Sequence, residues 1–228
     1  MRRLDCSALE GRASVVALAS GALRRHQLVV FPTDTVYAVA CDAFSAEGVE
    51  ALNEAKGRTS ATALPVMIGS LRALDGIVTG LSPNARDLLR GFWPGPLTAV
   101  CRAQPSLMWD LGGHDGGGAE RVAVRMPLHP LALGLLGEVG PLAVIGANRV
   151  GEPVPVDCDE AIDQLGDAVS FYLDAGPCPS GTASSVVDLT CTPPALLRTG
   201  ALPLESLQEV LPDLVDPDAG SPATTDGA

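Results

Sequence analysis

Four polar side chains at separated positions are of the types that bind an anionic ligand. Lys56 and Arg58 lie two residues apart across a glycine, so both could point to one ligand if a helix ends there. An exposed lysine and arginine at a helix end, where the helix dipole favours cations, would give the same pattern. Asn148 could bind a ligand through its amide or close an Asx turn, and Arg198 could reach inward or lie at the surface.

A compact polar segment, Pro-Thr-Asp-Thr-Val-Tyr at 32–37, interrupts two apolar runs. The strand before it runs into Pro32, which lacks a backbone donor, so regular pairing is expected to stop there. Thr33, Asp34 and Thr35 would then present two hydroxyls and a carboxylate at a strand end, where open α/β sheets place their binding crevices. A turn that caps the following helix is the alternative.

The elements that must position these residues alternate between apolar strands and helices. Unbroken or alternating apolar runs predict strands over 28–31, 36–41, 64–68, 97–101, 121–126, 142–145, 169–173 and 185–189. Helical spacing predicts helices over 12–27, 47–56, 82–90, 131–136 and 159–165, and a last periodic segment over 204–211. This order predicts a mixed α/β domain over 12–211, after a lead-in over 1–11 and before a disordered tail over 212–228.

Composition limits the classes of function. A formal net charge of -12 argues against a protein that neutralises nucleic-acid phosphates over a broad surface, although a local basic pocket remains compatible with it. The six cysteines are scattered without a C-x-x-C pair or histidines at metal-ligand spacing, so we expect them to be reduced and mostly buried. No segment reaches the length of a membrane span, and the cytoplasm is the expected compartment.

Seven segments, read in order, resemble the motifs of the YrdC-like threonylcarbamoyl-AMP synthase family. They are Pro-Thr-Asp-Thr-Val-Tyr at 32–37, Lys-Gly-Arg at 56–58, Phe-Trp-Pro-Gly-Pro-Leu-Thr at 92–98, Val-Ala-Val-Arg-Met-Pro at 122–127, Gly-Ala-Asn at 146–148, Gly-Thr-Ala-Ser-Ser-Val-Val-Asp-Leu-Thr at 181–190 and Leu-Arg-Thr-Gly at 197–200. The resemblance covers about residues 12 to 211. Seven motifs in the right order are far more specific than a single glycine-rich motif.

The resemblance implies a twisted mixed sheet with flanking helices around a concave basic site, in the short single-domain form of the family. It implies that L-threonine, bicarbonate or CO₂, and ATP are converted to threonylcarbamoyl-AMP and pyrophosphate. Downstream proteins would transfer the threonylcarbamoyl group to tRNA, whereas direct binding of tRNA to this chain would be weak or absent. Mg²⁺ is expected with the ATP, and a permanently bound cofactor is not expected.

The resemblance also implies roles for eight residues. ATP would be held by Lys56, Arg58, Gly146, Asn148 and Arg198. Among these, Lys56 and Arg58 are the expected catalytic residues, because their charges would stabilise the pyrophosphate as it leaves. Threonine would be held by Thr35, Arg125 and Ser184, with the guanidinium of Arg125 on its carboxylate.

Three positions depart from the family's pattern. Gly146 stands where the family usually has serine, which removes one hydroxyl contact to the nucleotide, and Ala38 stands where glycine normally follows the tyrosine. Thr59 replaces the proline that usually follows the Lys-Gly-Arg bend. Two alternatives therefore accompany the synthase: a paralogue that makes a different carbamoyl adenylate, and a non-catalytic RNA-binding module.

Overall fold

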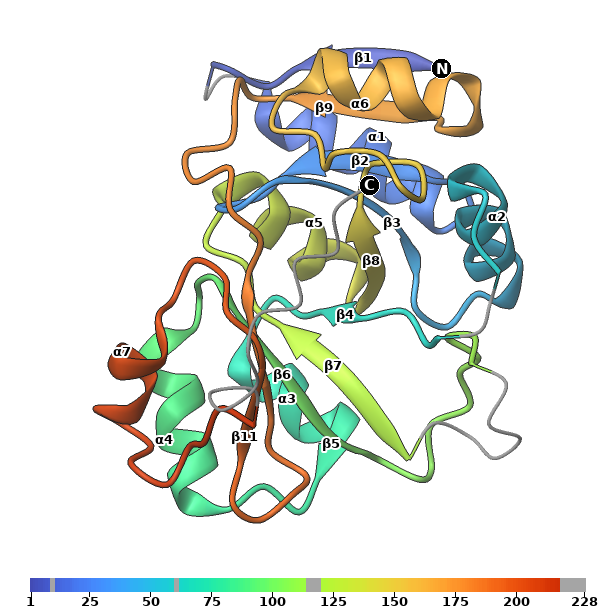
Figure 1. The fold of residues 1–228 in the computed structure, drawn as a ribbon. Coiled ribbons are helices and arrows are strands. Elements are labelled where there is room, and N and C mark those ends of the chain that lie inside the picture. The colour runs from blue at the N-terminus through green and yellow to red at the C-terminus, as the bar shows by residue number, and fades with distance from the viewer. Residues whose placement is uncertain (9–10, 60–61, 114–119, 218–228) are drawn as a thin grey trace.

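A single mixed sheet runs through the protein. The computed structural model describes residues 1–8, 11–59, 62–113 and 120–217. Within them the sheet has the strand order β1-β9-β2-β3-β8-β4-β7-β6-β10-β11, and β5 pairs with β6 outside this path (Figure 1). The strands are β1 (Arg2–Asp5), β2 (Val29–Pro32), β3 (Tyr37–Asp42), β4 (Val66–Met67), β5 (Val78–Thr79), β6 (Leu97–Ala103), β7 (Arg121–Arg125), β8 (Leu142–Gly146), β9 (Phe171–Asp174), β10 (Ser185–Asp188) and β11 (Ala195–Arg198).

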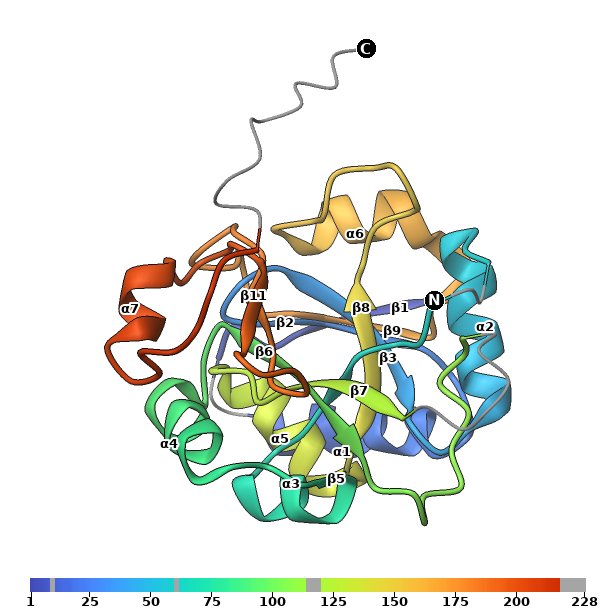
Figure 2. The same ribbon diagram turned by 60° about the horizontal axis from the view of Figure 1, so that its bottom comes forward.

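Helices cover both faces of this sheet. They are α1 (Arg12–Leu23), α2 (Ala46–Lys56), α3 (Leu71–Ile77), α4 (Pro83–Phe92), α5 (Pro130–Val139), α6 (Cys158–Leu165) and α7 (Leu204–Gln208), with a short 3₁₀ helix at Gly166–Ala168. Figure 2 shows α1 and α5 together on one side of β2 and β3, with α6 on the opposite side. The mixed α/β architecture with flanking helices is the one that the sequence predicts.

Burial on both faces explains why the central strands read as unbroken apolar runs. Along β3, Val39 and Cys41 pack into the core beneath α6 and α2, whereas Ala38 and Ala40 pack beneath α1 and α5. Successive side chains of a strand point to opposite faces, so a strand covered on both sides needs an apolar residue at every position. The scarcity of aromatic residues fits this arrangement, because small side chains let the helices lie close to the sheet.

Local signals set several element ends as predicted. Gly57 ends α2 in the left-handed conformation at φ 64°, where a residue with a Cβ would be strained. The Ser82 side chain accepts from the backbone of the third residue after it, and a proline occupies the first turn of α4. The first helix is shorter than predicted: α1 ends at Leu23, because the chain turns at His26, which has a φ of 62°.

Regular pairing of β2 stops at Pro32, as expected from the sequence, and Pro32 itself still belongs to the strand. Pro32 is the last residue of β2 and pairs with Tyr37 across the tight turn of residues 33–36. The pairing is compatible with proline because the missing donor falls at a strand end, where one ladder bond fewer is tolerated. The polar turn is therefore held between two paired strands.

Both ends of the described chain join the sheet. In the segment expected to be a lead-in, β1 pairs in parallel with β9. Beyond residue 211, Leu214 is buried and Val215 forms a bridge with Ala195 of β11. The expected tail thus includes described residues that pack on the domain, and its remainder, residues 218–228, lies outside the described part. Three elements besides β1 were not predicted from the sequence: α3, β5 and β11.

The cysteines agree with their predicted state. All six are free thiols, and every one except Cys191 is buried. Among the helices of the described residues, none combines the length and the hydropathy that a transmembrane segment requires.

Candidate active site

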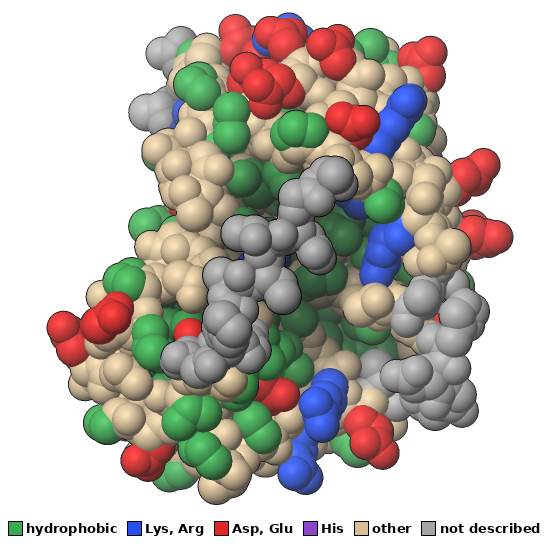
Figure 3. All heavy atoms as spheres, in the orientation of Figure 1, with side chains coloured by type: hydrophobic (Ala, Val, Ile, Leu, Met, Phe, Trp, Pro, Cys, Tyr) green, Lys and Arg blue, Asp and Glu red, His purple; other side chains and the backbone are tan. Residues whose placement is uncertain are grey.

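A cavity of about 580 Å³ opens at the middle of the sheet, and we call it the central pocket. Figure 3 shows this hollow with hydrophobic side chains in its floor and Lys and Arg side chains at its side. All eight residues that the sequence analysis assigned to ATP or threonine line it: Thr35, Lys56, Arg58, Arg125, Gly146, Asn148, Ser184 and Arg198. Segments separated by more than 160 residues of sequence are thereby brought to one site.

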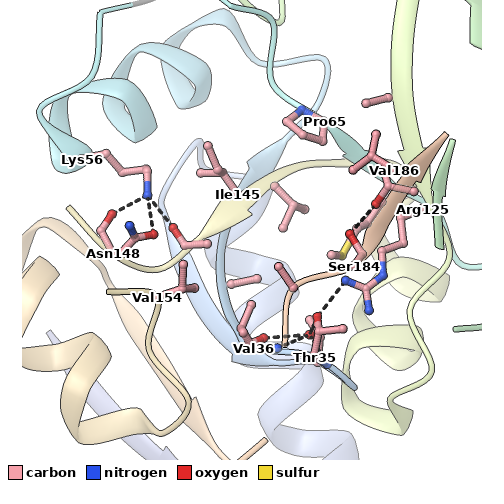
Figure 4. A pocket seen from close by; sticks show the side chains of 18 of the residues that line it. Thr35, Val36, Lys56, Pro65, Arg125, Ile145, Asn148, Val154, Ser184 and Val186 are labelled. Atoms are coloured by element: carbon pink, nitrogen blue, oxygen red, sulfur yellow. Dashed lines mark hydrogen bonds between the residues drawn. The ribbon is translucent and has the colours of Figure 1, made fainter. Parts of the chain in front are cut away.

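Lys56 forms one end of the central pocket, at the last turn of α2 (Figure 4). Its Nζ donates to Gly146 O at 2.6 Å, to Asn148 Oδ1 at 3.2 Å and to the backbone carbonyl of Asn148. Each of the three ammonium protons therefore has an acceptor. Burial, and then the neighbouring Arg58 charge, lower the pKa of Lys56 to about 8.

Arg58 and Arg198 are the cations that keep donors for a ligand. Arg58 donates through Nη1 to Asn53 Oδ1 at 3.0 Å and through Nη2 to the carbonyl of Thr62. Arg198 donates through Nε and Nη2 to Ser184 O, at 3.1 and 2.9 Å. Arg198 Nη2 also donates to Ser184 Oγ at 3.2 Å. A guanidinium has five N–H groups, so Arg58 retains three and Arg198 retains two that meet no other acceptor among the described residues. Burial lowers the pKa of both arginines, and both stay charged.

Arg125 lies at the opposite end of the pocket and is 5% exposed. Its Nη2 donates to Asp34 Oδ1 at 2.7 Å, its Nη1 to Thr35 Oγ1 at 2.8 Å and its Nε to Gly95 O at 3.1 Å. Asp34 Oδ1 also accepts from the backbone N–H of Leu128 at 2.9 Å. Burial lowers the pKa of Arg125, and the charge of Asp34 opposes this effect. The carboxylate thus holds a buried guanidinium in place.

Four hydroxyls surround this end in two pairs. Thr33 Oγ1 lies 2.9 Å from Thr35 Oγ1, donates to Val36 O at 2.7 Å and accepts from the backbone of the turn. Thr98 Oγ1 lies 2.8 Å from Ser184 Oγ. Neither Thr98 nor Thr33 was assigned to ATP or threonine, although Thr33 belongs to the polar segment expected at a strand end. Both stand inside segments that resemble the family's motifs, so their motif membership was the signal that could have found them.

Gly146 is packed more tightly than the sequence suggests. A Cβ added there would lie 2.9 Å from Val154 Cγ1 and 3.0 Å from Asn148 Oδ1. The missing serine therefore leaves no open space, because Val154 occupies it and lines the pocket itself. The sequence does not predict this role of Val154, because residue types do not show that its loop folds back over β8. Ala38 and Thr59, the other two departures, also line the pocket.

The middle of the pocket is apolar, and its described residues include no group of side chains that could bind a metal ion. Its floor is formed by Val36, Pro65, Val66, Met67, Ala123, Val144, Ile145 and Val186. In the described part of the chain, no three His, Cys, Asp or Glu residues come together as a metal site. The arrangement can hold an anionic ligand at the cationic rim, a flat or apolar group over the floor, and a small carboxylate with hydroxyl partners beside Arg125.

Comparisons with known proteins agree on one family. The Sua5_yciO_yrdC family model, described as "Telomere recombination", matches residues 21–200. A Mycobacterium tuberculosis protein provisionally named threonylcarbamoyl-AMP synthase is 47% identical over 207 residues, which are 91% of this chain and 94% of that protein. The threonylcarbamoyl-AMP synthase of Bacillus subtilis is 35% identical over 197 residues, which are 86% of this chain and 56% of that longer protein.

The fold is also similar to a solved structure of this family. The crystal structure of Pyrococcus abyssi Sua5 complexed with L-threonine superposes with a TM-score of 0.88 at 32% identity. The match covers 100% of this chain and 66% of that chain.

Proposed function

The chain belongs to the Sua5, YciO and YrdC family and is a threonylcarbamoyl-AMP synthase. From this premise we propose how its residues carry out the reaction. The observation that carries the proposal is the convergence of eight separated residues on one pocket with a cationic rim and a hydroxyl-lined end. Both substrates fit this division, because ATP brings phosphates and threonine brings a carboxylate, an amine and a hydroxyl.

The reaction needs no nucleophile from the protein. The threonine nitrogen attacks CO₂ and loses a proton, and an oxygen of the resulting carbamate attacks the α-phosphorus of ATP. The bond from the α-phosphorus to the bridging oxygen breaks, and pyrophosphate leaves with the electron pair. Both steps are accelerated mainly by orientation and by stabilisation of the charge on the departing phosphates.

We assign the departing phosphates to Arg58 and Arg198, which keep N–H groups for them. Lys56 would act differently, since its three donors already hold Gly146 and Asn148. Its charge would stabilise the phosphates through the electric field while its hydrogen bonds fix the loop beneath the nucleotide. Mg²⁺ would enter with ATP, bound to phosphate oxygens and water, because this ion keeps several waters and needs few protein ligands.

We assign threonine to the end formed by Thr35, Arg125 and Ser184. The L-threonine complex of the Pyrococcus abyssi protein, at 32% identity, supports the choice of this amino acid. The product would supply downstream proteins that transfer the threonylcarbamoyl group to tRNA, and the net charge of -12 favours little direct binding of tRNA to this chain. The six free thiols are typical of a reducing compartment, so we place the reaction in the cytoplasm.

A pyrophosphate-release assay tests the proposal. The purified protein should release pyrophosphate only when Mg²⁺-ATP, bicarbonate and threonine are all present, and a panel of other amino acids should react more slowly. Arg198→Gln should lower the rate, whereas Arg90→Gln, on the exposed face of α4, should not. Release that is indifferent to threonine would exclude the synthase reaction, and equal turnover of another amino acid would favour a paralogue.

A further inference from the structure

Thr98 lies on β6 between two neighbouring strands that line the proposed amino-acid site. It pairs directly with Arg125 on β7 and with Val186 on β10. Residues opposite each other on adjacent strands share one face, with Cβ atoms about 5 Å apart. All three side chains line the central pocket, and Thr98 is 7% exposed. Thr98 therefore lies beside Arg125 on the wall of the same pocket.

A chain of hydrogen bonds sets the direction of the Thr98 hydroxyl. Arg198 Nη2 donates to Ser184 Oγ at 3.2 Å, and Ser184 Oγ lies 2.8 Å from Thr98 Oγ1. Either hydroxyl of this pair could donate. A hydroxyl that accepts from a cation becomes the stronger donor, and we therefore assign the donor role to Ser184 and the acceptor role to Thr98. Within the part of the chain that the structure describes, the proton of Thr98 is then left without an acceptor. The nearest place for one is the pocket.

Arg125 by itself is a weak partner for a carboxylate. Three of its five N–H groups are taken by Gly95, Thr35 and Asp34. Asp34 also balances its charge at 2.7 Å, so the pair as a whole offers little net attraction for a second anion. A carboxylate placed here needs another donor beside the guanidinium, and Thr98 is the neighbour with a proton to give.

We propose that Thr98 is a further substrate-binding residue, which donates a hydrogen bond to the α-carboxylate of the bound amino acid beside Arg125. This inference rests on the proposed function, because it assumes that an amino acid occupies this end of the pocket. It adds a residue that none of the assigned roles includes. It also joins Arg198 at the nucleotide end to the amino-acid end through Ser184, so that the two substrates share one hydrogen-bonded chain.

Thr98→Val tests the proposal because it removes the hydroxyl and keeps the shape. The dissociation constant for threonine should rise about tenfold, as expected for a lost hydrogen bond to a charged group, and the dissociation constant for ATP should stay within about twofold. Thr98→Ser should restore most of the affinity. Thr79→Val, at the exposed end residue of β5, is the matched control and should change neither constant.

Threonine analogues identify the group that Thr98 contacts. 2-Aminobutyrate keeps the carboxylate and lacks the hydroxyl, so Thr98→Val should weaken it by the same factor as threonine. Threoninamide has a neutral amide in place of the carboxylate, and its oxygen is a weaker acceptor, so the substitution should weaken threoninamide less than threonine. If threoninamide is weakened and 2-aminobutyrate is not, Thr98 binds the threonine hydroxyl and the proposal is wrong. If Thr98→Val binds threonine like the unchanged protein, Thr98 contacts no substrate.

The outcome can be separated from failure of the proposed function. The unchanged protein is first assayed for threonine-dependent pyrophosphate release, and absence of that activity would contradict the function itself. Thermal unfolding of Thr98→Val, compared with Thr79→Val, shows whether the fold is intact. With activity present and the fold intact, the analogue series alone decides the role of Thr98.

Discussion

Binding of ATP should take up a proton, and replacing Lys56 with arginine should abolish this uptake. Burial and the neighbouring Arg58 lower the pKa of Lys56 to about 8 in the free protein. Phosphates that arrive nearby favour the charged form and raise this pKa towards its ordinary value. With a pKa of about 8, the deprotonated fraction of Lys56, and hence the proton uptake per ATP, is about 0.1 at pH 7, about 0.5 at pH 8 and about 0.9 at pH 9.

Titration calorimetry measures the uptake directly. Mg²⁺-ATP is titrated at each pH in two buffers that differ in ionisation enthalpy, and the difference in heat gives the number of protons. The affinity for ATP should also fall about tenfold per pH unit above pH 8, since ATP favours protonated Lys56. In Lys56→Arg the charge is kept and does not titrate in this range, so both effects should vanish.

The same lowered pKa predicts how stability changes with pH. Between about pH 8 and the ordinary value of 10.5, the unfolded chain binds more protons at Lys56 than the folded chain does. The free energy of unfolding therefore receives a contribution from Lys56 that rises with pH in this window.

Two outcomes of the calorimetry would refute the assignment of the titration to Lys56. They are no proton uptake on ATP binding at pH 9, and an uptake that persists in Lys56→Arg.

Three further predictions concern two tightly packed glycines and one buried ion pair. Gly200→Ala should lower the free energy of unfolding by about 3 kcal/mol in urea titrations, because its Cβ would lie 2.3 Å from a backbone carbonyl oxygen of the neighbouring loop. Gly146→Ser should weaken ATP binding severalfold in calorimetry through the clash with Val154, and adding Val154→Ala should restore it. Asp34→Ala should lower the free energy of unfolding by about 3 to 5 kcal/mol, because Arg125 stays buried without its carboxylate.

Matched controls accompany these variants. Gly137→Ala, in α5, places its Cβ in open space and should stabilise the protein slightly. Asp75→Ala removes an exposed ion pair with Arg86 and should change stability little. If Gly200→Ala is as stable as Gly137→Ala, the predicted clash at position 200 is wrong. If Asp34→Ala is as stable as Asp75→Ala, the ion pair with Arg125 does not stabilise the fold. If Val154→Ala does not restore ATP binding, Val154 is not what excludes a side chain at 146.

The strongest local patterns predicted most of the fold. Apolar runs marked β2 and β3, and the cap at Ser82 and the glycine at 57 marked the ends of α4 and α2. Strand β1 was not predicted, because Arg-Arg-Leu-Asp has no apolar run and because its pairing depends on β9, which lies far along the chain. Strand β4 lies within the strand predicted over 64–68, but it has only two residues, because its pairing with β7 and β8 sets its ends.

The sequence predicted which residues line the candidate site better than it predicted which side chains contact one another. The motifs identified the eight residues that the pocket gathers, but not the ion pair between Asp34 and Arg125, which are 91 positions apart. They also gave no sign that Lys56 already uses its three donors. Gly146 was interpreted as a lost hydroxyl, whereas packing against Val154 decides its environment. Such details depend on tertiary packing, which residue types do not reveal.

The span of the central pocket along the chain has a consequence for synthesis. Its lining begins at Thr33 in the turn after β2 and ends at Arg198 on β11, so no shorter nascent chain contains it. Closing contacts between such distant residues is slow compared with forming local ones. A ribosome must therefore release almost the whole domain before ATP or threonine can bind, and either ligand would then protect the entire domain against proteases.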